Sequence, residues 1–266
     1  MSPPDAATIP VFILCGGLGT RLGERAANGP KPMVPIGDRP IVWHIMRSYA
    51  RFGFRRFILC VGHRGEVVAD WFANWAYRTN DFTVSLAERA IHIHQSEPLP
   101  DWEVTIAQTG EATMTGGRIA RAAARYLGAA PHFAVTYGDG LTDADLDAQL
   151  RFHLSHQRLG TVLGVHPPSS FGRFELHEER VAAFVEKPEQ TDEWINGGYF
   201  LFRRGVLEHL STDADCVLEQ EPLRRLAALG EIELFRHDGF WSCMDTPKDH
   251  DRMQAIWRSG AAPWLG

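Results

Sequence analysis

The residues with the clearest capacity for chemistry form a glycine-rich turn near the start of the chain. The turn follows an apolar run, residues 10–15, and contains Gly16, Gly17, Gly19, Thr20 and Arg21. A buried strand that stops at such a turn leaves backbone N–H groups unpaired and pointing outward, which suits a triphosphate. Arg21 and the later Lys31 add positive charge. The turn therefore predicts a phosphate-binding site.

Two familiar nucleotide motifs do not fit this turn. A P-loop requires Gly-Lys-Ser or Gly-Lys-Thr, whereas the basic Arg21 follows these glycines. The dinucleotide fingerprint requires a third glycine where Leu22 stands, and an acidic residue closing a following strand, which the sequence lacks at the expected distance. We therefore expect a different nucleotide-binding fold.

Two aspartates are candidate metal ligands. Asp139 follows an apolar run in Gly138-Asp139-Gly140, where the flanking glycines leave room for a metal beside a bound ligand. Taken singly, Asp139, Asp245, Lys187 and the turn at 196–198 would each be ordinary surface features. The histidines lack metal-site spacing and acidic neighbours, so we assign the following three to packing or to the surface: His63, His92 and His94.

The elements that must position these residues alternate between strand and helix. Apolar runs at 10–15 and 56–62 have the pattern of strands buried on both faces, and helical spacing occupies 40–52 and 66–75. This alternation is typical of doubly wound sheets, whose ligands bind at the carboxyl ends of the strands. We predict an α/β fold with a Rossmann-like, mixed but mostly parallel sheet and flanking helices.

After residue 75 the alternation of strands and helices is interrupted, and it then resumes. Alternating residues within about 76–104 predict a small inserted β segment. We expect Thr142 or Asp143 to cap a helix that runs to about residue 156. The remaining expected helices cover 116–127 and 218–229, and the remaining expected strands cover 132–137, 160–166, 181–186 and 199–202.

Composition excludes several classes of protein. A net charge of −6 and an isoelectric point near 6.0 argue against a nucleic-acid partner, which needs a basic face. The 4 cysteines form no C-x-x-C pair, so neither a disulfide framework nor a zinc site is indicated. No signal-peptide pattern or long apolar run is present. We expect a cytoplasmic protein with no membrane partner.

A set of motifs occurs together and in order along the chain. The segments lie at 16–22, 31–34, 40–46, 114–118, 136–140, 171–172, 186–188, 195–198, 219–223, 239–241 and 244–246. In these motifs the chain closely resembles the sugar-1-phosphate nucleotidylyltransferases, and within them the glucose-1-phosphate cytidylyltransferases that make CDP-glucose. The resemblance covers nearly the whole chain, from Val11 to Trp264. The first glycine motif marks the wider superfamily, and three others point to the cytidylyltransferase branch.

The resemblance implies condensation of CTP with a sugar 1-phosphate, most simply α-D-glucose 1-phosphate, with Mg²⁺ as cofactor and release of pyrophosphate. It implies catalytic roles for Arg21, Lys31 and Asp139, and metal binding by Asp139 and Asp245. The nucleotide would contact Gly16, Gly17, Gly19, Thr20, Arg21, Lys31, Thr115, Gly116, Arg118 and Gly138, with Arg118 donating to cytosine. The sugar phosphate would contact Tyr137, Glu186, Lys187, Asn196 and Gly197.

The resemblance also shapes the expected organisation. We expect a flexible tail at 1–9 and a single nucleotidyltransferase domain over 10–266, whose part from about 160 binds the sugar. Proteins of this family tend to form oligomers, so the resemblance implies a homo-oligomer. Arg173-Phe174 departs from the family pattern near the expected sugar pocket, which leaves the sugar's identity open.

Three alternatives remain open on the sequence. The same reaction with another sugar phosphate or another nucleoside triphosphate fits the same motifs. A glycosyltransferase that uses a nucleotide sugar is less consistent, because Gly138-Asp139-Gly140 is not an Asp-x-Asp metal motif. A binding module that kept the fold without activity is disfavoured by the presence of both aspartates and both lysines.

Overall fold

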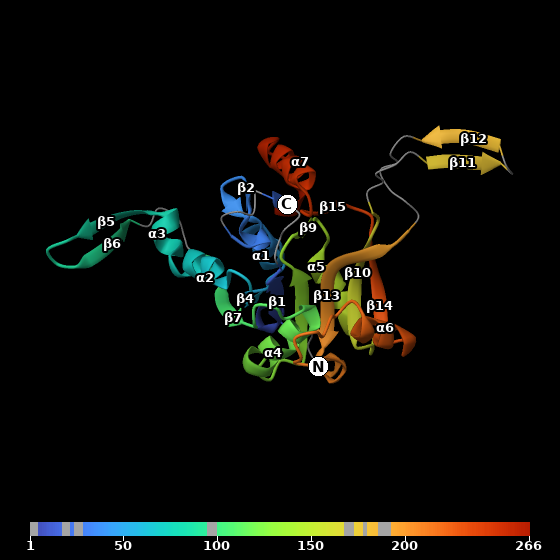
Figure 1. The fold of residues 1–266 in the computed structure, drawn as a ribbon, viewed down its shortest axis with the longest axis horizontal. Coiled ribbons are helices and arrows are strands. Elements are labelled where there is room, and N and C mark those ends of the chain that lie inside the picture. The colour runs from blue at the N-terminus through green and yellow to red at the C-terminus, as the bar shows by residue number, and fades with distance from the viewer. Residues whose placement is uncertain are drawn as a thin grey trace.

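A single seven-stranded sheet carries the fold (Figure 1). The computed structural model describes residues 5–17, 22–23, 29–94, 100–167, 173–177, 180–185 and 193–266, with the backbone alone for 173–177 and 184–185. The strands of the sheet are β1 (Pro10–Cys15), β4 (Arg56–Val61), β7 (Glu103–Gln108), β8 (His132–Tyr137), β10 (Gly160–Val165), β13 (Ile195–Arg203) and β14 (Ile232–His237).

The order of the strands is β14-β10-β13-β8-β1-β4-β7. β13 runs antiparallel to β8 and β10, whereas the other neighbouring pairs are parallel. The predicted mixed, mostly parallel sheet is therefore confirmed.

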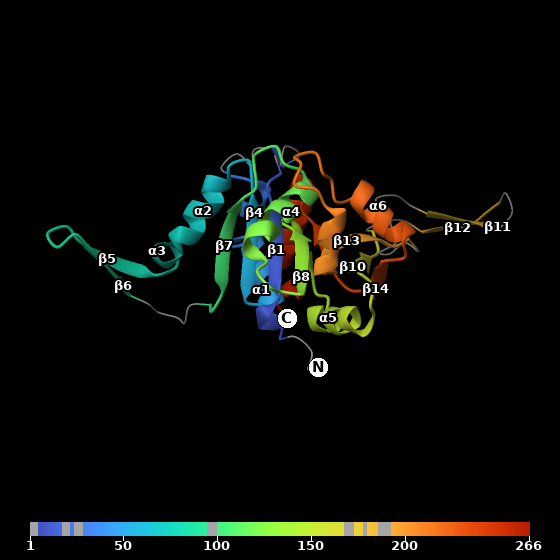
Figure 2. The same cartoon turned by 90° about the horizontal axis from the view of Figure 1, so that it is seen from below.

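Helices cover both faces of this sheet, as the view from below shows (Figure 2). They are α1 (Ile41–Arg51), α2 (Gly65–Ala73), α4 (Thr115–Tyr126), α5 (Leu146–Ser155), α6 (Glu221–Ala228) and α7 (Pro247–Arg258). The short helix α3 (Trp75–Thr79) follows α2 and lies away from the sheet. Side chains of α1, α2, α5 and α7 enter the hydrophobic core on one face, and those of α4 and α6 enter the core on the other.

β1 shows why its sequence is apolar throughout. Val11, Ile13 and Cys15 join one core, while Phe12 and Leu14 join the other. Successive side chains of a strand point to opposite faces, so a central strand between two helical layers must be apolar on both. The strand predicted at 10–15 is confirmed on this basis.

Four short strand pairs lie outside the central sheet. β5–β6 and β11–β12 form hairpins that project from opposite ends of the molecule (Figure 1). β9 and β15 pair just beyond the end of β8. The bounds are β2 (Pro35–Ile36) with β3 (Arg39–Pro40), β5 (Asp81–Ser85) with β6 (Ala90–His94), β9 (Gly140–Thr142) with β15 (Trp241–Cys243), and β11 (Arg173–His177) with β12 (Arg180–Val185).

Two local expectations differ from the structure. The end of the predicted insertion, from Glu103, belongs to β7, which pairs in parallel with β4 at the edge of the central sheet. Its polar residues Glu103 and Thr105 alternate with apolar ones, so its sequence does not stand out from the alternating strands of the insertion. The helix expected after residue 142 is capped by Asp145, whose carboxylate accepts from the Ala148 N–H at 2.8 Å. The expected caps were therefore wrong, because Thr142 belongs to β9.

No helix among the described residues is both long and apolar enough to cross a membrane.

A buried histidine joins α1 to the end of the chain. Trp264 Nε1 donates to His44 Nδ1 at 3.3 Å, so Nε2 carries the proton that is donated to the carbonyl of Ile36 at 2.8 Å. The ring also packs edge-on against Trp257. A second proton would face the Trp264 donor in a buried site, and burial lowers the pKa of His44 to about 4.

We expect this histidine to make stability depend on pH. Its pKa is lower in the folded than in the unfolded chain, where it is about 6.5. Stability is therefore complete above about pH 6.5 and falls as the pH drops toward 4, by about 1.4 kcal/mol per pH unit. Urea unfolding of the wild-type protein and of His44→Gln at pH 7 and pH 5 tests this. The variant should lose less stability between the two pH values, and equal losses would contradict the assignment.

Candidate active site

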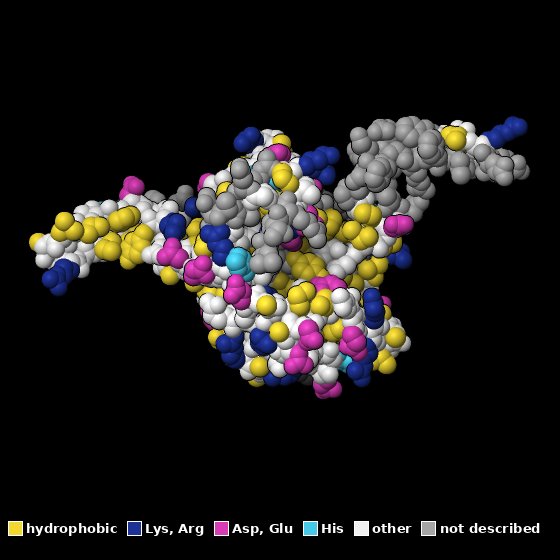
Figure 3. All heavy atoms as spheres, viewed as in Figure 1, with side chains coloured by type: hydrophobic (Ala, Val, Ile, Leu, Met, Phe, Trp, Pro, Cys, Tyr) yellow, Lys and Arg dark blue, Asp and Glu magenta, His cyan; other side chains and the backbone are white. Residues whose placement is uncertain are grey.

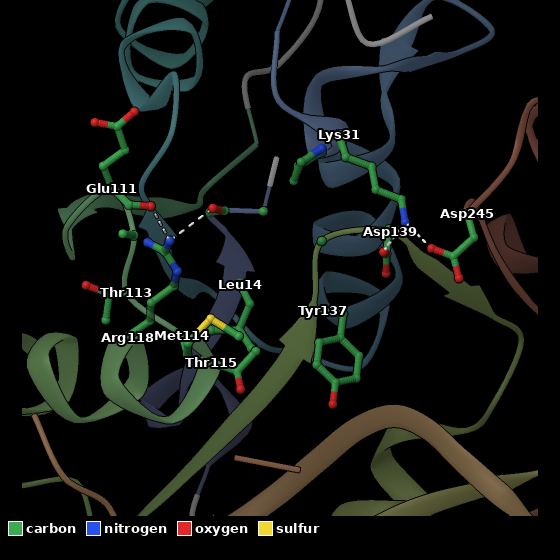
Figure 4. A pocket seen from close by; sticks show the side chains of 15 residues that line it. Leu14, Lys31, Glu111, Thr113, Met114, Thr115, Arg118, Tyr137, Asp139 and Asp245 are labelled. Atoms are coloured by element: carbon green, nitrogen blue, oxygen red, sulfur yellow. Dashed lines mark hydrogen bonds and ion pairs between the residues drawn. The ribbon is translucent and has the colours of Figure 1, made fainter. Parts of the chain in front are cut away.

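A cavity of about 730 Å³ opens at the carboxyl ends of the central strands. This location is where doubly wound sheets bind their ligands, and the volume suits a nucleotide-sized molecule. Figure 4 shows two groups of side chains, with Lys31 and the aspartates on one side and Arg118 on the other. The lining residues are Leu14, Gly16, Gly17, Lys31, Pro32, Glu111, Ala112, Thr113, Met114, Thr115, Arg118, Tyr137, Gly138, Asp139 and Asp245.

One ammonium group joins the two candidate metal ligands. Lys31 Nζ lies 2.6 Å from Asp139 Oδ2 and 2.5 Å from Asp245 Oδ1 (Figure 4). Burial alone lowers the pKa of Lys31, but the charges and hydrogen bonds of the two carboxylates outweigh it, so this pKa is raised. The trio carries one positive and two negative charges, which leaves a net negative charge at the cavity wall.

The position of Asp139 follows from tight backbone packing around it. Gly138 donates its N–H to the Leu14 carbonyl at 3.1 Å, and a Cβ at Gly138 would lie 2.6 Å from Pro32 Cγ. Only glycine allows this approach, which brings the turn containing Lys31 beside the end of β8. The Asp139 carbonyl in turn accepts from Met244 N–H at 2.9 Å.

Asp245 reaches the same place from the far end of the chain. Pairing of β15 with β9 carries the backbone to the site, and the helix α7 begins immediately afterwards. A capping box between Thr246 and Asp249 fixes that helix start. The Cys243 thiol contacts Asp245 Oδ2 at 3.6 Å, and its pKa is raised by burial to about 12, so it remains a protonated donor.

These two carboxylates fit a hard divalent cation. Each directs one oxygen at the same Lys31 nitrogen, which shows that a single cation can contact both. Mg²⁺ is commonly held by one or two carboxylates, with phosphate and water completing its shell. The described residues contain no cluster of three or more acidic, histidine or cysteine ligands, so substrate phosphates would have to supply further oxygens.

Arg118 lies buried on the opposite side of the cavity. Its Nη1 donates to the carbonyls of Val61 and Gly110, and its Nη2 donates to those of Gly16 and Glu111. A Cβ at Gly16 would lie 2.0 Å from Arg118 Cζ, so the first glycine of the turn makes room for this guanidinium. Arg118 thus ties the ends of several strands together, and this use of its donors argues against direct contact with cytosine.

The loop before α6 packs against the start of α4 and accepts hydrogen bonds from it. The carbonyls of Ala214 and Cys216 accept from the N–H groups of Met114 and Gly117 at 2.7 and 3.0 Å. A Cβ at Gly116 would lie 2.6 Å from Cys216 Sγ. The glycine pair therefore permits close helix–loop packing, which is a different reason from the nucleotide contact expected at Gly116.

A hydrogen-bonded group extends from the cavity toward β13. Tyr137 donates its hydroxyl to Glu219 Oε1 at 2.5 Å, and Thr115 donates to Glu219 Oε2 at 2.6 Å. Asn196 Nδ2 donates to the Tyr137 oxygen at 3.3 Å. Burial and then the Glu219 charge raise the pKa of Tyr137, so its phenol stays protonated.

The predicted site residues fall into three groups. Gly16, Gly17, Lys31, Thr115, Arg118, Tyr137, Gly138, Asp139 and Asp245 line one cavity. Gly116, Asn196 and Gly197 lie outside its lining, although Asn196 contacts Tyr137. Gly19, Thr20, Arg21, Glu186 and Lys187 lie outside the described residues.

Sequence reasoning missed several residues of the site. Glu111, Ala112 and Thr113 line the cavity but stand in a segment without a glycine or charge motif. The sequence indicates no role for Glu219. The only signal for it was its place in a segment, 219–223, that matches the family pattern.

Comparisons with known proteins support the family resemblance found in the sequence. The family model described as nucleotidyl transferase matches residues 10–225. Glucose-1-phosphate cytidylyltransferase of Salmonella typhimurium is 42% identical over 252 residues, which cover 95% of this chain and 97% of that protein. Mannose-1-phosphate guanylyltransferase of Mycobacterium tuberculosis is 29% identical over 262 residues, covering 96% of this chain and 66% of that protein.

Solved structures share the fold. HddC from Yersinia pseudotuberculosis aligns with a TM-score of 0.65 at 22% identity, covering 94% of this chain and 99% of that one. A Bacillus anthracis protein in complex with sucrose aligns with a TM-score of 0.67 at 16% identity, covering 96% and 95%. Since the family model spans most of the sequence and the Salmonella relative matches it nearly end to end, this chain belongs to the nucleotidyl transferase family.

Proposed function

We propose that this protein condenses CTP with α-D-glucose 1-phosphate to give CDP-glucose and pyrophosphate. The observation that carries the proposal is the convergence of Asp139 and Asp245 on one cation at the wall of the cavity. The nature of the substrates follows the Salmonella relative, whose match covers 95% of this chain.

The reaction needs no strong base. A phosphate monoester has a second pKa of about 6, so near pH 7 the sugar phosphate is largely dianionic. One of its oxygens attacks the α-phosphorus of CTP. A new P–O bond forms there as the bond to the β-phosphate oxygen breaks, and pyrophosphate leaves with that electron pair. Catalysis then consists mainly of positioning two polyanions and stabilising their charge.

We propose that Asp139 and Asp245 hold Mg²⁺ during this reaction. Their oxygens already share a cation, and the net negative charge of the trio would repel a triphosphate unless further positive charge were added. With Mg²⁺ held by Asp139 and Asp245, the site would gain that charge and could stabilise the negative charge of the phosphates. Lys31, whose ammonium now lies on both carboxylates, would then be able to contact the triphosphate instead.

The remaining roles are proposed from the resemblance and from position. The backbone of Gly16, Gly17 and Gly19 would contact the nucleotide, with Thr20 and Arg21 beside it. Thr115 and Gly138 line the same cavity. Tyr137, Glu186, Lys187, Asn196 and Gly197 would contact the sugar phosphate, with Lys187 on its phosphate group.

We also propose that the protein forms a homo-oligomer through the hairpin β5–β6. Cross-strand pairing places Phe82 beside Ile93 and Val84 beside Ile91 on one face, and each is 39–48% exposed. Figure 3 shows this apolar surface along the projecting ribbon. An isolated two-stranded hairpin is marginally stable in water, so a partner covering this face is expected.

A second copy of the chain fits this face. In a two-fold pairing the same apolar surface meets itself, with the tip of each ribbon over the base of the other. Arg89 lies at the tip and Asp81 lies at the base, so this arrangement brings opposite charges together at both ends.

The proposed reaction is tested by pyrophosphate release. The four nucleoside triphosphates are each mixed with a panel of hexose 1-phosphates and Mg²⁺. We expect CTP with glucose 1-phosphate to give the highest kcat/KM, and the Asp139→Asn enzyme to lose at least about 100-fold because an amide is a poor Mg²⁺ ligand. Asp147→Asn, on the exposed side of α5, is the control and should retain activity. Preference for another pair of substrates, or full activity of Asp139→Asn, would refute the corresponding assignment.

The proposed interface is tested by light scattering after size exclusion. We expect the wild-type mass to exceed the 29.8 kDa of one chain, and Val84→Lys to shift it toward that value, because a buried lysine would lose its hydration. Thr83→Lys, on the opposite face of the same strand, should keep the wild-type mass. A monomeric wild-type protein, or no change with Val84→Lys, would rule the ribbon out as the interface.

A further inference from the structure

Glu219 is the one acidic side chain, among the described residues, that contacts two cavity-lining hydroxyls at once. It lies in the loop before α6, outside the cavity lining, and is half-buried. Thr115 comes from the start of α4 and Tyr137 from the end of β8. The carboxylate therefore links the start of α4 to the end of β8 from outside the cavity lining.

The directions of the protons in this group are fixed. An ionised carboxylate only accepts hydrogen bonds, so the contacts at 2.5 and 2.6 Å require Tyr137 and Thr115 to donate their hydroxyl protons. The Thr115 oxygen in turn accepts from the Leu218 N–H at 2.9 Å. Each hydroxyl thus has its only proton engaged with Glu219.

The Tyr137 oxygen is consequently an acceptor toward every other neighbour. Asn196 demonstrates this, because its Nδ2 donates to that oxygen at 3.3 Å. A flip of the Asn196 amide group would break a hydrogen bond, because Asn196 Oδ1 accepts from the Gly198 N–H at 2.8 Å. Asn196 is exposed and its contact with Tyr137 is long, so this hydrogen bond is one that a better-placed donor on a bound ligand would replace at little cost.

The hydroxyls of Thr115 and Tyr137 lie on the side of the cavity away from Lys31 (Figure 4). The ammonium and carboxylates are therefore separated from these groups, and charged phosphates would bind on the Lys31 side. The hydroxyl side suits an uncharged part of the substrate that carries hydrogen-bond donors, such as a sugar ring.

We propose that Glu219 is a positioning residue that sets substrate selectivity: by taking the Tyr137 proton it makes Tyr137 accept a hydrogen bond from one sugar hydroxyl. A site built to pair with a substrate hydroxyl rejects analogues that lack it, because the buried partner is left unpaired. This inference rests on the proposed function and adds a selectivity element to it.

Singly deoxyfluorinated glucose 1-phosphates test the proposal. Fluorine is small but cannot donate a hydrogen bond. With the wild-type enzyme, kcat/KM should fall at least about 10-fold at one hydroxyl position, which identifies the donor to Tyr137. In Tyr137→Phe that loss should shrink to within about 3-fold, because no acceptor remains to be left unpaired.

Glu219→Gln is the decisive variant. Its amide donates as well as accepts, so the hydroxyl protons are no longer held in one direction, and the discrimination should shrink as in Tyr137→Phe. Glu221→Gln makes the same chemical change at an exposed glutamate in the same segment and should keep the wild-type discrimination. Wild-type discrimination in the Glu219→Gln enzyme would overturn the proposal.

A binding measurement separates this inference from the proposed function. Calorimetric titration with CDP-glucose needs no turnover, and Glu219→Gln should bind it at least about 10-fold more weakly than Glu221→Gln does. Wild-type binding with unchanged affinity in Glu219→Gln would overturn the role of Glu219 alone. Absence of CDP-glucose binding by the wild-type protein would overturn the proposed function, and this inference with it.

Discussion

The placement of two carboxylates around one cation is the constraint on which the rest of the site depends. Asp139 follows β8 and Asp245 precedes α7, yet each has an oxygen within 2.6 Å of Lys31 Nζ. Two carboxylates this close repel each other strongly in a partly buried site, so a positive charge between them stabilises the pair. Lys31 supplies it in the free protein.

This requirement accounts for several features of the fold that have no direct contact with substrate. The pairing of β9 with β15 exists at the point where the chain must bring Asp245 to the end of β8. Gly138 lets the turn containing Lys31 approach, and the capping box at Thr246 fixes where α7 begins. Each of these features positions one member of the trio.

Much of the architecture could be predicted because it follows from local patterns. The apolar run at 10–15 predicts β1, because a strand buried on both faces is apolar throughout. The spacing at 40–52 predicts α1, because a helix buried along one stripe repeats its apolar residues every three or four positions. β7 could not be assigned to the central sheet because polar residues alternate with Val104 and Ile106, a pattern that an exposed or antiparallel strand also shows. Asp145 could not be singled out as the cap, because the turn before α5 contains several oxygen-bearing side chains and only the backbone path selects among them.

The residues of the site likewise fall into those that the sequence indicates and those that it does not. Lys31, Asp139 and Asp245 could be singled out by residue type together with a family resemblance, and the structure brings their side chains together. The roles of Arg118 and Glu219 could not be read from the sequence. Their hydrogen-bond partners are carbonyls and hydroxyls from distant segments, and such partners leave no pattern along the chain.

Titration of the nucleotide-free protein with Mn²⁺, followed by electron paramagnetic resonance, tests the shared cation position most directly. In the wild-type protein Lys31 competes with the metal, so Lys31→Met should bind Mn²⁺ at least about 10-fold more tightly, and adding Asp245→Asn to that variant should remove the gain. Lys248→Met, an exposed lysine on α7, is the control and should bind as the wild type does. Equal Mn²⁺ affinity of folded Lys31→Met and wild-type protein would contradict the account.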